Sequence, residues 1–150
     1  MTDEQRKNYH DKVDNNIKMF GYHSTFVFAD NTPSFCYSTG IYKSFGIPEL
    51  FISSLPRNLS GGLVENYVNK FKSLGTIPLD TRIDDLTDRF SVYLIEVPID
   101  NLTDYVLSSI RFYKGEDYKY IQLIYPDTNG LFPNDKGYDY DQIIMGQFKN

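Results

Sequence analysis

The chain contains no tryptophan, one cysteine and two histidines. Because Cys36 stands alone, no disulfide can form within the chain, and we expect the protein in a reducing compartment, the cytoplasm. No Cys–His pair has the spacing of a zinc site, so no bound metal is expected. No motif places a proton acceptor beside Cys36 either, and we interpret this residue as a buried, inert thiol that function does not require.

Positive charge and long apolar runs are also scarce. The net charge is −5, from 20 acidic and 15 basic residues, and no basic patch of the kind that binds nucleic acid is visible. No apolar stretch approaches the roughly 20 residues that span a bilayer, and the amino terminus is too polar for a secretory signal. The sequence therefore predicts a soluble, cytoplasmic protein that binds neither nucleic acid nor membrane.

Tyrosine and phenylalanine, in contrast, are abundant, with 13 and 11 residues. A tyrosine side chain combines apolar area with a polar tip, which suits a hydrated binding surface or the rim of a pocket. Tyrosine is also a good strand former on half-buried sheets. The composition alone leaves both interpretations open.

Hydrophobic periodicity predicts one α+β domain over residues 1–150, with residues 1–21 as an amino-terminal helix and residues 22–150 as the body. A capping box at Thr2 and a terminal Gly21 delimit the first helix. We expect a mainly antiparallel five-stranded sheet with about three helices gathered on one face. The strands are predicted at 23–29, 35–41, 49–55, 90–97 and 118–125, and the later helices at 58–75 and 100–115.

The strand at 90–97 is almost continuously apolar, which predicts a central position in the sheet. Residues 30–33 are expected to turn the chain between the first two strands, and residues 76–89 form the longest irregular segment. The predicted core is Phe26, Phe35, Leu50, Ile52, Val64, Val68, Phe71, Val92, Leu94, Val106, Ile110 and Leu123.

Polar side chains at the strand ends are the strongest functional signal in the sequence. Glu49, Gln122 and Asp127 could converge on one mouth of the sheet, with Tyr37 and Tyr125 as aromatic walls. Thr39 would add a hydroxyl group. Apolar walls with a few placed polar groups are typical of a small-molecule pocket. Alternatively, these residues satisfy backbone groups at strand ends and in the turn that follows.

Three short elements resemble those of a bacterial family, domain of unknown function 4262. Tyr37-Ser38-Thr39-Gly40-Ile41 is similar to its Tyr-Thr-x-Gly-Leu element with one residue inserted, and Gly46-Ile47-Pro48-Glu49-Leu50 matches Gly-x-Pro-Glu-Leu. The stretch from Gln122 to Pro133 matches Gln-x-x-x-Pro-Asp-x-x-Gly-x-Phe-Pro, and Gln142 can serve as the late glutamine. Ile47 and Asn134 depart from the histidine and the aromatic residue that members often carry. The resemblance implies a soluble bacterial domain and no particular reaction.

Two function classes follow from these observations. The first is a domain that binds a small molecule in a pocket at the sheet edge, with the question of enzymatic activity and of any cofactor open. The second is a protein-interaction module of the inhibitor or immunity type, which would present an acidic, tyrosine-rich surface to a basic partner. A homodimer is compatible with the second class.

Overall fold

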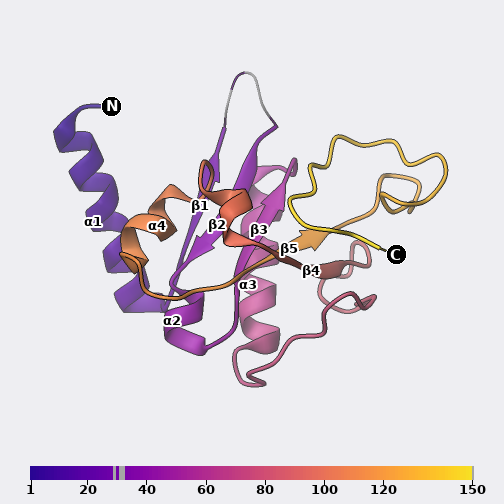
Figure 1. Ribbon diagram of the computed structural model, residues 1–150, viewed down its shortest axis with the longest axis horizontal. Coiled ribbons are helices and arrows are strands. Elements are labelled where there is room, and N and C mark those ends of the chain that lie inside the picture. Colours follow the sequence, from indigo (N-terminus) through magenta and orange to yellow (C-terminus); the bar gives the residue numbers. More distant parts are fainter. Residues whose placement is uncertain (29, 31–32, 150) are drawn as a thin grey trace.

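Five strands form one sheet in the order β1-β2-β3-β5-β4 (Figure 1). Neighbouring strands are antiparallel except for β3 and β5, which run parallel. The computed structural model describes residues 1–28, 30 and 33–149, and it confirms the predicted α+β class and the mainly antiparallel five-stranded sheet. The strand bounds are His23–Val27 (β1), Phe35–Thr39 (β2), Glu49–Ser53 (β3), Tyr93–Val97 (β4) and Tyr120–Ile124 (β5). The predicted strand end at residue 29 and the predicted turn through residues 31–32 lie outside the described residues.

One face of the sheet is covered by α3 (Arg57–Phe71). Its apolar stripe recurs at helical spacing, so one side of the helix is buried and the other is exposed to water. Leu50, Ile52 and Leu123 of the sheet pack in the same cluster as this stripe. The long irregular segment completes the cover with Ile83 and Leu86. The helix residues of the cluster are Leu63, Val64, Tyr67, Val68 and Phe71.

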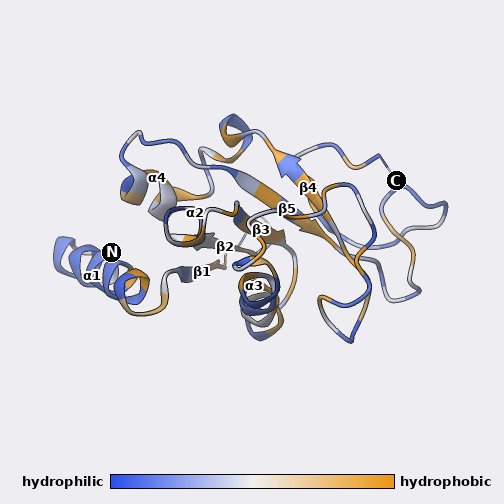
Figure 2. Cartoon of the chain, turned by 90° about the horizontal axis from the view of Figure 1, so that it is seen from below, coloured by the Kyte–Doolittle hydropathy of each residue, from blue (hydrophilic) through white to orange (hydrophobic). Residues whose placement is uncertain are grey.

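The opposite face is covered by several shorter pieces of chain. Tyr37, Phe51 and Gln122 lie in register across β2, β3 and β5, so their side chains share this face. Over it lie the short helix η1 (Ile99–Leu102), α4 (Leu107–Tyr113) and, toward β4, the carboxyl-terminal segment. Helix α1 (Asp3–Phe20) packs beside them on β1 and α4. Figure 2 shows α3 and α4 on opposite sides of the sheet, which corrects the expectation that the helices gather on one face.

The strand at Tyr93–Val97 lies at the edge of the sheet, so the prediction of a central position was wrong. Its apolar character has another cause. Ile95 on one face packs with Ile124 and Phe132 in a cluster that the carboxyl-terminal segment covers. Leu94 on the other face belongs to the α3 core. Each face of this edge strand therefore carries a buried apolar side chain, a pattern that the sequence of one segment cannot distinguish from that of a central strand.

The helices also differ in detail from their predicted bounds. The capping box of Thr2 with Gln5 and the Gly21 end of α1 are confirmed. The expected helix at 100–115 is divided into η1 and α4, because Val106 has a non-helical backbone and buries its side chain on the sheet. The second strand ends at Thr39, and the next residues form a short helix, α2 (Ile41–Phe45). Helix α3 starts after Pro56 without a side-chain cap, one residue before its predicted start, and ends at Phe71.

Most of the predicted core is buried. Ile110 is an exception, with 39% of its surface exposed on the outer side of α4, and Phe26 is only partly buried on the edge strand β1. Among the described residues, no helix is long and apolar enough to cross a membrane.

Candidate functional site

Glu49 is a fully buried carboxylate at the start of β3, and it is surrounded by hydrogen-bond donors. Its Oε1 accepts from the Ser38 hydroxyl at 2.7 Å and from the Ile41 backbone N–H at 3.1 Å. Its Oε2 accepts from the N–H groups of Gly40 and Tyr42, at 2.9 and 3.0 Å, and from the Tyr113 hydroxyl. Three of the five donors are backbone N–H groups at the amino end of α2, where negative charge is favoured. Glu49 therefore acts as the cap of this helix.

The local sequence explains how the helix end reaches Glu49. Gly40 precedes α2 with φ of 105°, a region that L side chains rarely adopt. A Cβ atom at this position would lie 2.9 Å from the backbone oxygen of Gly21, so space also requires glycine. Burial raises the pKa of the Glu49 carboxyl above its ordinary value, while the surrounding donors oppose that rise. Burial and the Glu49 charge together raise the pKa of Tyr113 far above its ordinary range.

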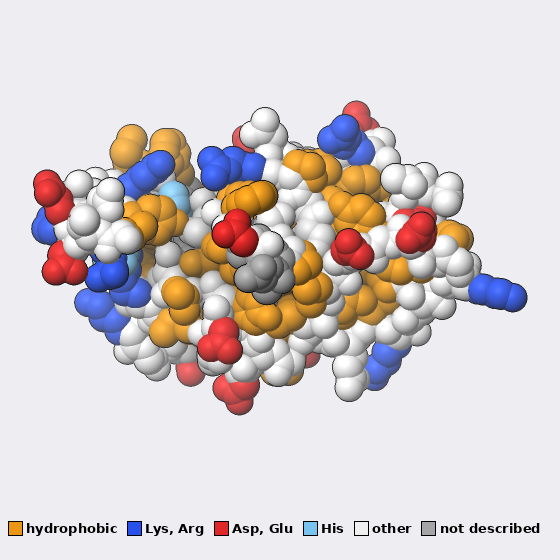
Figure 3. Space-filling model, turned by 90° about the horizontal axis from the view of Figure 1, so that it is seen from above, with side chains coloured by type: hydrophobic (Ala, Val, Ile, Leu, Met, Phe, Trp, Pro, Cys, Tyr) orange, Lys and Arg blue, Asp and Glu red, His pale blue; other side chains and the backbone are white. Residues whose placement is uncertain are grey.

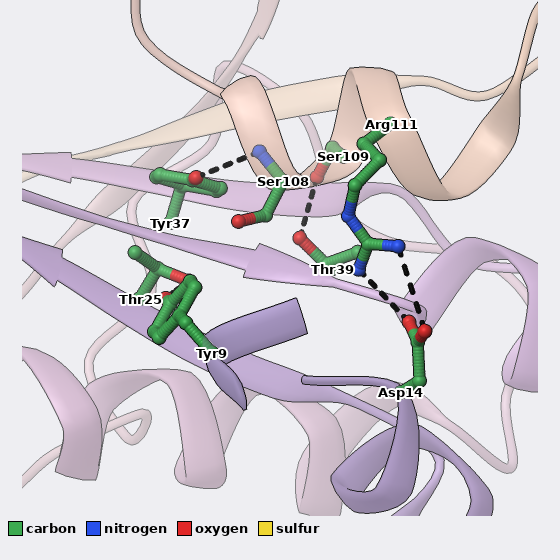
Figure 4. Close-up of polar contacts among 8 residues, drawn as sticks. All are labelled: Tyr9, Asp14, Thr25, Tyr37, Thr39, Ser108, Ser109 and Arg111. Atoms are coloured by element: carbon green, nitrogen blue, oxygen red, sulfur yellow. Dashed lines mark hydrogen bonds and ion pairs between the residues drawn. The ribbon is translucent and has the colours of Figure 1, made fainter. Parts of the chain in front are cut away.

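Tyr37 and Thr39 connect β2 to α4 on the same face (Figure 4). The Tyr37 hydroxyl accepts from the Ser108 backbone N–H at 3.0 Å, which satisfies one free donor at the start of α4. The Thr39 hydroxyl lies 2.7 Å from that of Ser109, and both side chains are buried. These two residues hold α4 on the sheet.

Gln122 binds the carboxyl-terminal segment, residues 142–148. Its Nε2 donates to the Ile143 carbonyl at 2.6 Å, and its Oε1 accepts from the Met145 N–H at 2.7 Å. The buried amide thus pairs with two backbone groups in the way a neighbouring strand would. Gln142 makes an equivalent pair with the backbone of Tyr125, at 3.1 Å to its N–H and 2.8 Å to its carbonyl.

Tyr125 and Asp127 lie just beyond the end of β5. The Tyr125 hydroxyl donates to the Ser53 carbonyl at 2.6 Å. Asp127 accepts from the N–H groups of Asn129, Leu131 and Asp139, which arranges the loop after β5. Although burial opposes it, these backbone donors hold the pKa of the Asp127 carboxyl below its ordinary value.

The structure therefore brings Tyr37, Thr39, Glu49 and Gln122 to one face of the sheet and places Tyr125 and Asp127 past its end. Each of the six side chains is bonded within the protein. An open cavity lies near Glu49 instead, at the sheet end where β3 and β5 start and β4 finishes. We call it the sheet-end pocket. Its volume is about 490 Å³, and it is lined by Pro48, Ile77, Leu79, Glu96, Val97, Pro98, Ile99, Tyr118, Lys119, Tyr120 and Ile121.

Tyr118 joins the sheet-end pocket to the buried Glu49. Tyr118 is a lining residue of the pocket, and its ring stacks on that of Tyr113, with centroids 4.4 Å apart and planes 12° from parallel. Tyr113 in turn donates to Glu49. Burial and the Glu49 charge raise the pKa of Tyr118.

A second hollow of about 500 Å³ shares Glu96 and Pro98 with the sheet-end pocket, so the two lie beside each other at the end of β4. Sequence reasoning missed the residues that line the sheet-end pocket, because they come from four separate segments of the chain. The available signal was the apolar residues of the irregular segment, of which Ile77 and Leu79 line the pocket while Ile83 and Leu86 join the α3 core.

The cysteine and the acidic groups give no further catalytic arrangement. Cys36 is buried, and burial raises its pKa to about 12, so the reactive thiolate is absent at neutral pH. Within the described part of the chain, no three His, Cys, Asp or Glu residues are grouped closely enough to hold a metal ion.

A family model described as a domain of unknown function (DUF4262) matches residues 16–139, and the chain belongs to this family. The match confirms the resemblance that was based on the three sequence elements. Comparisons with curated proteins and with solved structures gave no match.

Proposed function

We propose that this member of the family binds a small molecule in the sheet-end pocket. The observation that carries the proposal is the combination of size and lining. The volume lies in the range of roughly 300–1,000 Å³ that is typical of ligand sites, and most lining side chains are apolar. Leu79 and Ile77 supply an outer wall from the long irregular segment, and such segments often carry function.

The polar groups of the pocket indicate the kind of ligand. The Tyr118 hydroxyl, the Glu96 carboxylate and the Lys119 ammonium group come from residues that line it, next to apolar surface on Pro48, Ile77 and Leu79. The adjoining hollow at Glu96 is more polar, with Asn101 and Gln147 in its lining. A ligand with a flat apolar part and a hydrogen-bonding end that reaches along β4 would match both regions.

In this proposal, Glu49 supports the pocket from behind. Its hydrogen bond fixes the Tyr113 hydroxyl, and the stacked Tyr118 ring is thereby held against the pocket. Glu49 would contribute to ligand binding through the Tyr118 ring. The contribution of Tyr37, Thr39 and Gln122 would be indirect as well, because they hold α4 and the carboxyl-terminal segment on the sheet.

Titration with indole tests the pocket, because indole is flat, apolar and carries one N–H donor. NMR chemical shifts of the backbone amides of Glu96, Val97, Ile99 and residues 118–121 should change in a saturable way. Leu79→Trp should fill the pocket and abolish these changes. Leu107→Trp is the matched control, since Leu107 is 61% exposed on α4 and does not line the pocket. Native mass spectrometry of the purified protein would report a retained ligand.

Two results would overturn the proposal. The first is the absence of saturable shifts at these amides for indole and for other flat fragments of similar size. The second is equal binding by the Leu79→Trp variant, which would place the ligand elsewhere on the protein.

A protein-interaction function is the second candidate. Its support is the exposure of large apolar side chains, with Phe28 80% and Leu107 61% exposed. Apolar side chains are visible on the face in Figure 3, which looks onto the end of the sheet where β1 and β2 are connected. The acidic tyrosine-rich segment supports it less, because the Tyr138 and Tyr140 hydroxyls bond to Gln142 and to the Ser54 carbonyl within the protein. Light scattering across a concentration series would detect self-association.

A further inference from the structure

A separate hollow of about 450 Å³ lies where α1, α2 and α4 meet, and it shares no lining residue with the sheet-end pocket. Ile17 and Phe112 give it apolar walls. Besides Ser44, four cationic side chains and one acidic side chain complete the lining. They are Lys18, Lys43, Arg111, Lys114 and Asp14.

The positive charge of this three-helix hollow stands out on a chain whose net charge is −5. Part of it has an ordinary explanation, because the four cations lie in the last turn or at the end of a helix. A helix end carries about half a negative charge, and cations are favoured there. Three such ends and Asp14 still do not cancel four cations, and α2 and α4 are short helices with 5 and 7 residues. The hollow therefore keeps a positive surplus.

The Arg111–Asp14 ion pair is part of the lining of the hollow. Arg111 reaches from α4 to α1, where its Nη2 lies 2.9 Å from the Asp14 carboxylate (Figure 4). Its Nε atom is buried and has no hydrogen-bond partner among the described residues. The Lys43 ammonium lies 5.5 Å from the centre of the Phe112 ring. Within the described ranges, no ion pair engages Lys18, Lys43 or Lys114, so their charges are available to a ligand.

We propose that the three-helix hollow binds the phosphate group of a small organic phosphate. Lysine ammonium groups bind phosphate as point charges, and hydrogen bonds between charged groups are stronger than neutral ones. The walls of Ile17 and Phe112 would contact the organic part, so an aromatic phosphate should bind better than phosphate alone. The chemistry differs from that of the sheet-end pocket, and the two sites are independent proposals.

Phenyl phosphate is the probe, measured by isothermal titration and by NMR shifts of the amides of residues 43, 44 and 111–114 at low salt. The double variant Lys18→Gln/Lys43→Gln should weaken binding by about tenfold or more, as expected when charged hydrogen bonds are lost. The double variant Lys7→Gln/Lys70→Gln removes the same charge from lysines that do not line the hollow, and it should bind as the unaltered protein does. Benzyl alcohol, which lacks the phosphate, should not bind.

The proposal fails if the unaltered protein shows no saturable binding of phenyl phosphate. It also fails if both double variants lose affinity equally, because the effect would then be one of net charge alone. The Leu79→Trp variant separates the two sites, since it should keep full affinity for phenyl phosphate while it loses indole binding.

Discussion

Replacing Glu49 with glutamine tests whether this buried carboxylate stabilises the fold as the cap of α2. The carboxylate accepts hydrogen bonds from five donors, and the side chain is fully buried. Glutamine keeps one accepting oxygen and replaces the other with an N–H₂ group, which only donates. At least one backbone N–H must therefore lose its acceptor.

The loss in the free energy of unfolding depends on which carboxylate oxygen is replaced. If the amide nitrogen takes the place of Oε1, the Ile41 N–H is left without a partner, while the Ser38 hydroxyl can rotate to accept. If it takes the place of Oε2, the N–H groups of Gly40 and Tyr42 both lose theirs. One buried unsatisfied donor costs about 1–3 kcal/mol, and the remaining bonds lose the charge that strengthened them. Relief of the buried charge offsets part of this loss. We expect the free energy of unfolding to fall by about 2–4 kcal/mol.

Urea unfolding followed by far-UV circular dichroism measures this change. The midpoint should fall by roughly 1–2 M for a slope typical of small proteins. Glu65→Gln is the matched control, because Glu65 lies on the exposed face of α3 and its replacement should change stability by less than about 0.5 kcal/mol. A Glu49→Gln midpoint equal to that of the control would refute the capping role.

Three further predictions follow from buried groups. Gln122→Leu removes the hydrogen bonds to the backbone of residues 143 and 145, so it should lower the free energy of unfolding by about 1–3 kcal/mol. Chymotrypsin should then cleave faster near Phe148. Unchanged cleavage would contradict the inference that Gln122 holds the carboxyl-terminal segment on the sheet. Cys36 should react with a thiol reagent only after unfolding, since burial raises the pKa of the thiol to about 12. Cys36→Ser should leave indole binding intact. Fast labelling of Cys36 in the native protein would contradict the first expectation. Burial also raises the pKa of Tyr67 and Tyr125, so these phenols stay protonated in the folded state while those of the unfolded chain ionise at their ordinary pKa. Their contribution to the free energy of unfolding should be fully present below about pH 10 and should fall as the pH rises further. Urea midpoints that stay constant up to pH 11 would contradict this prediction.

The fold class was predictable because its signals are local. The capping box at Thr2, the terminal Gly21 and the apolar stripe of α3 each depend on neighbouring residues, and each is present in the structure. The edge position of β4 was not predictable, since the burial of Ile95 depends on Phe132 and on a segment about fifty residues away. The same holds for the break at Val106, where packing against the sheet overrides helical periodicity.

For the candidate site, too, local sequence predicted which residues matter and missed what depends on tertiary contacts. Sequence reasoning selected Glu49 and Gln122 because a polar side chain in an apolar strand must be bonded or functional, and both are bonded. It could not see that their partners are backbone groups of α2 and of the carboxyl-terminal segment. Nor could it assemble the sheet-end pocket, whose lining combines residues from Pro48 to Ile121 only after β3 and β5 pair.

That parallel pairing also sets the order in which the protein can assemble during synthesis. Leu50 pairs with Ile121, so about 70 residues must be added after β3 before its second neighbour exists. Until then, a nascent chain can form the β1–β2–β3 meander and α3, yet the inner edge of β3 has free N–H and C=O groups. Closing so long a loop is slow compared with forming a hairpin. The half-made protein is therefore the species most exposed to aggregation, and a ribosome-bound chain that stops before residue 120 should need a chaperone that a chain extended past residue 125 does not.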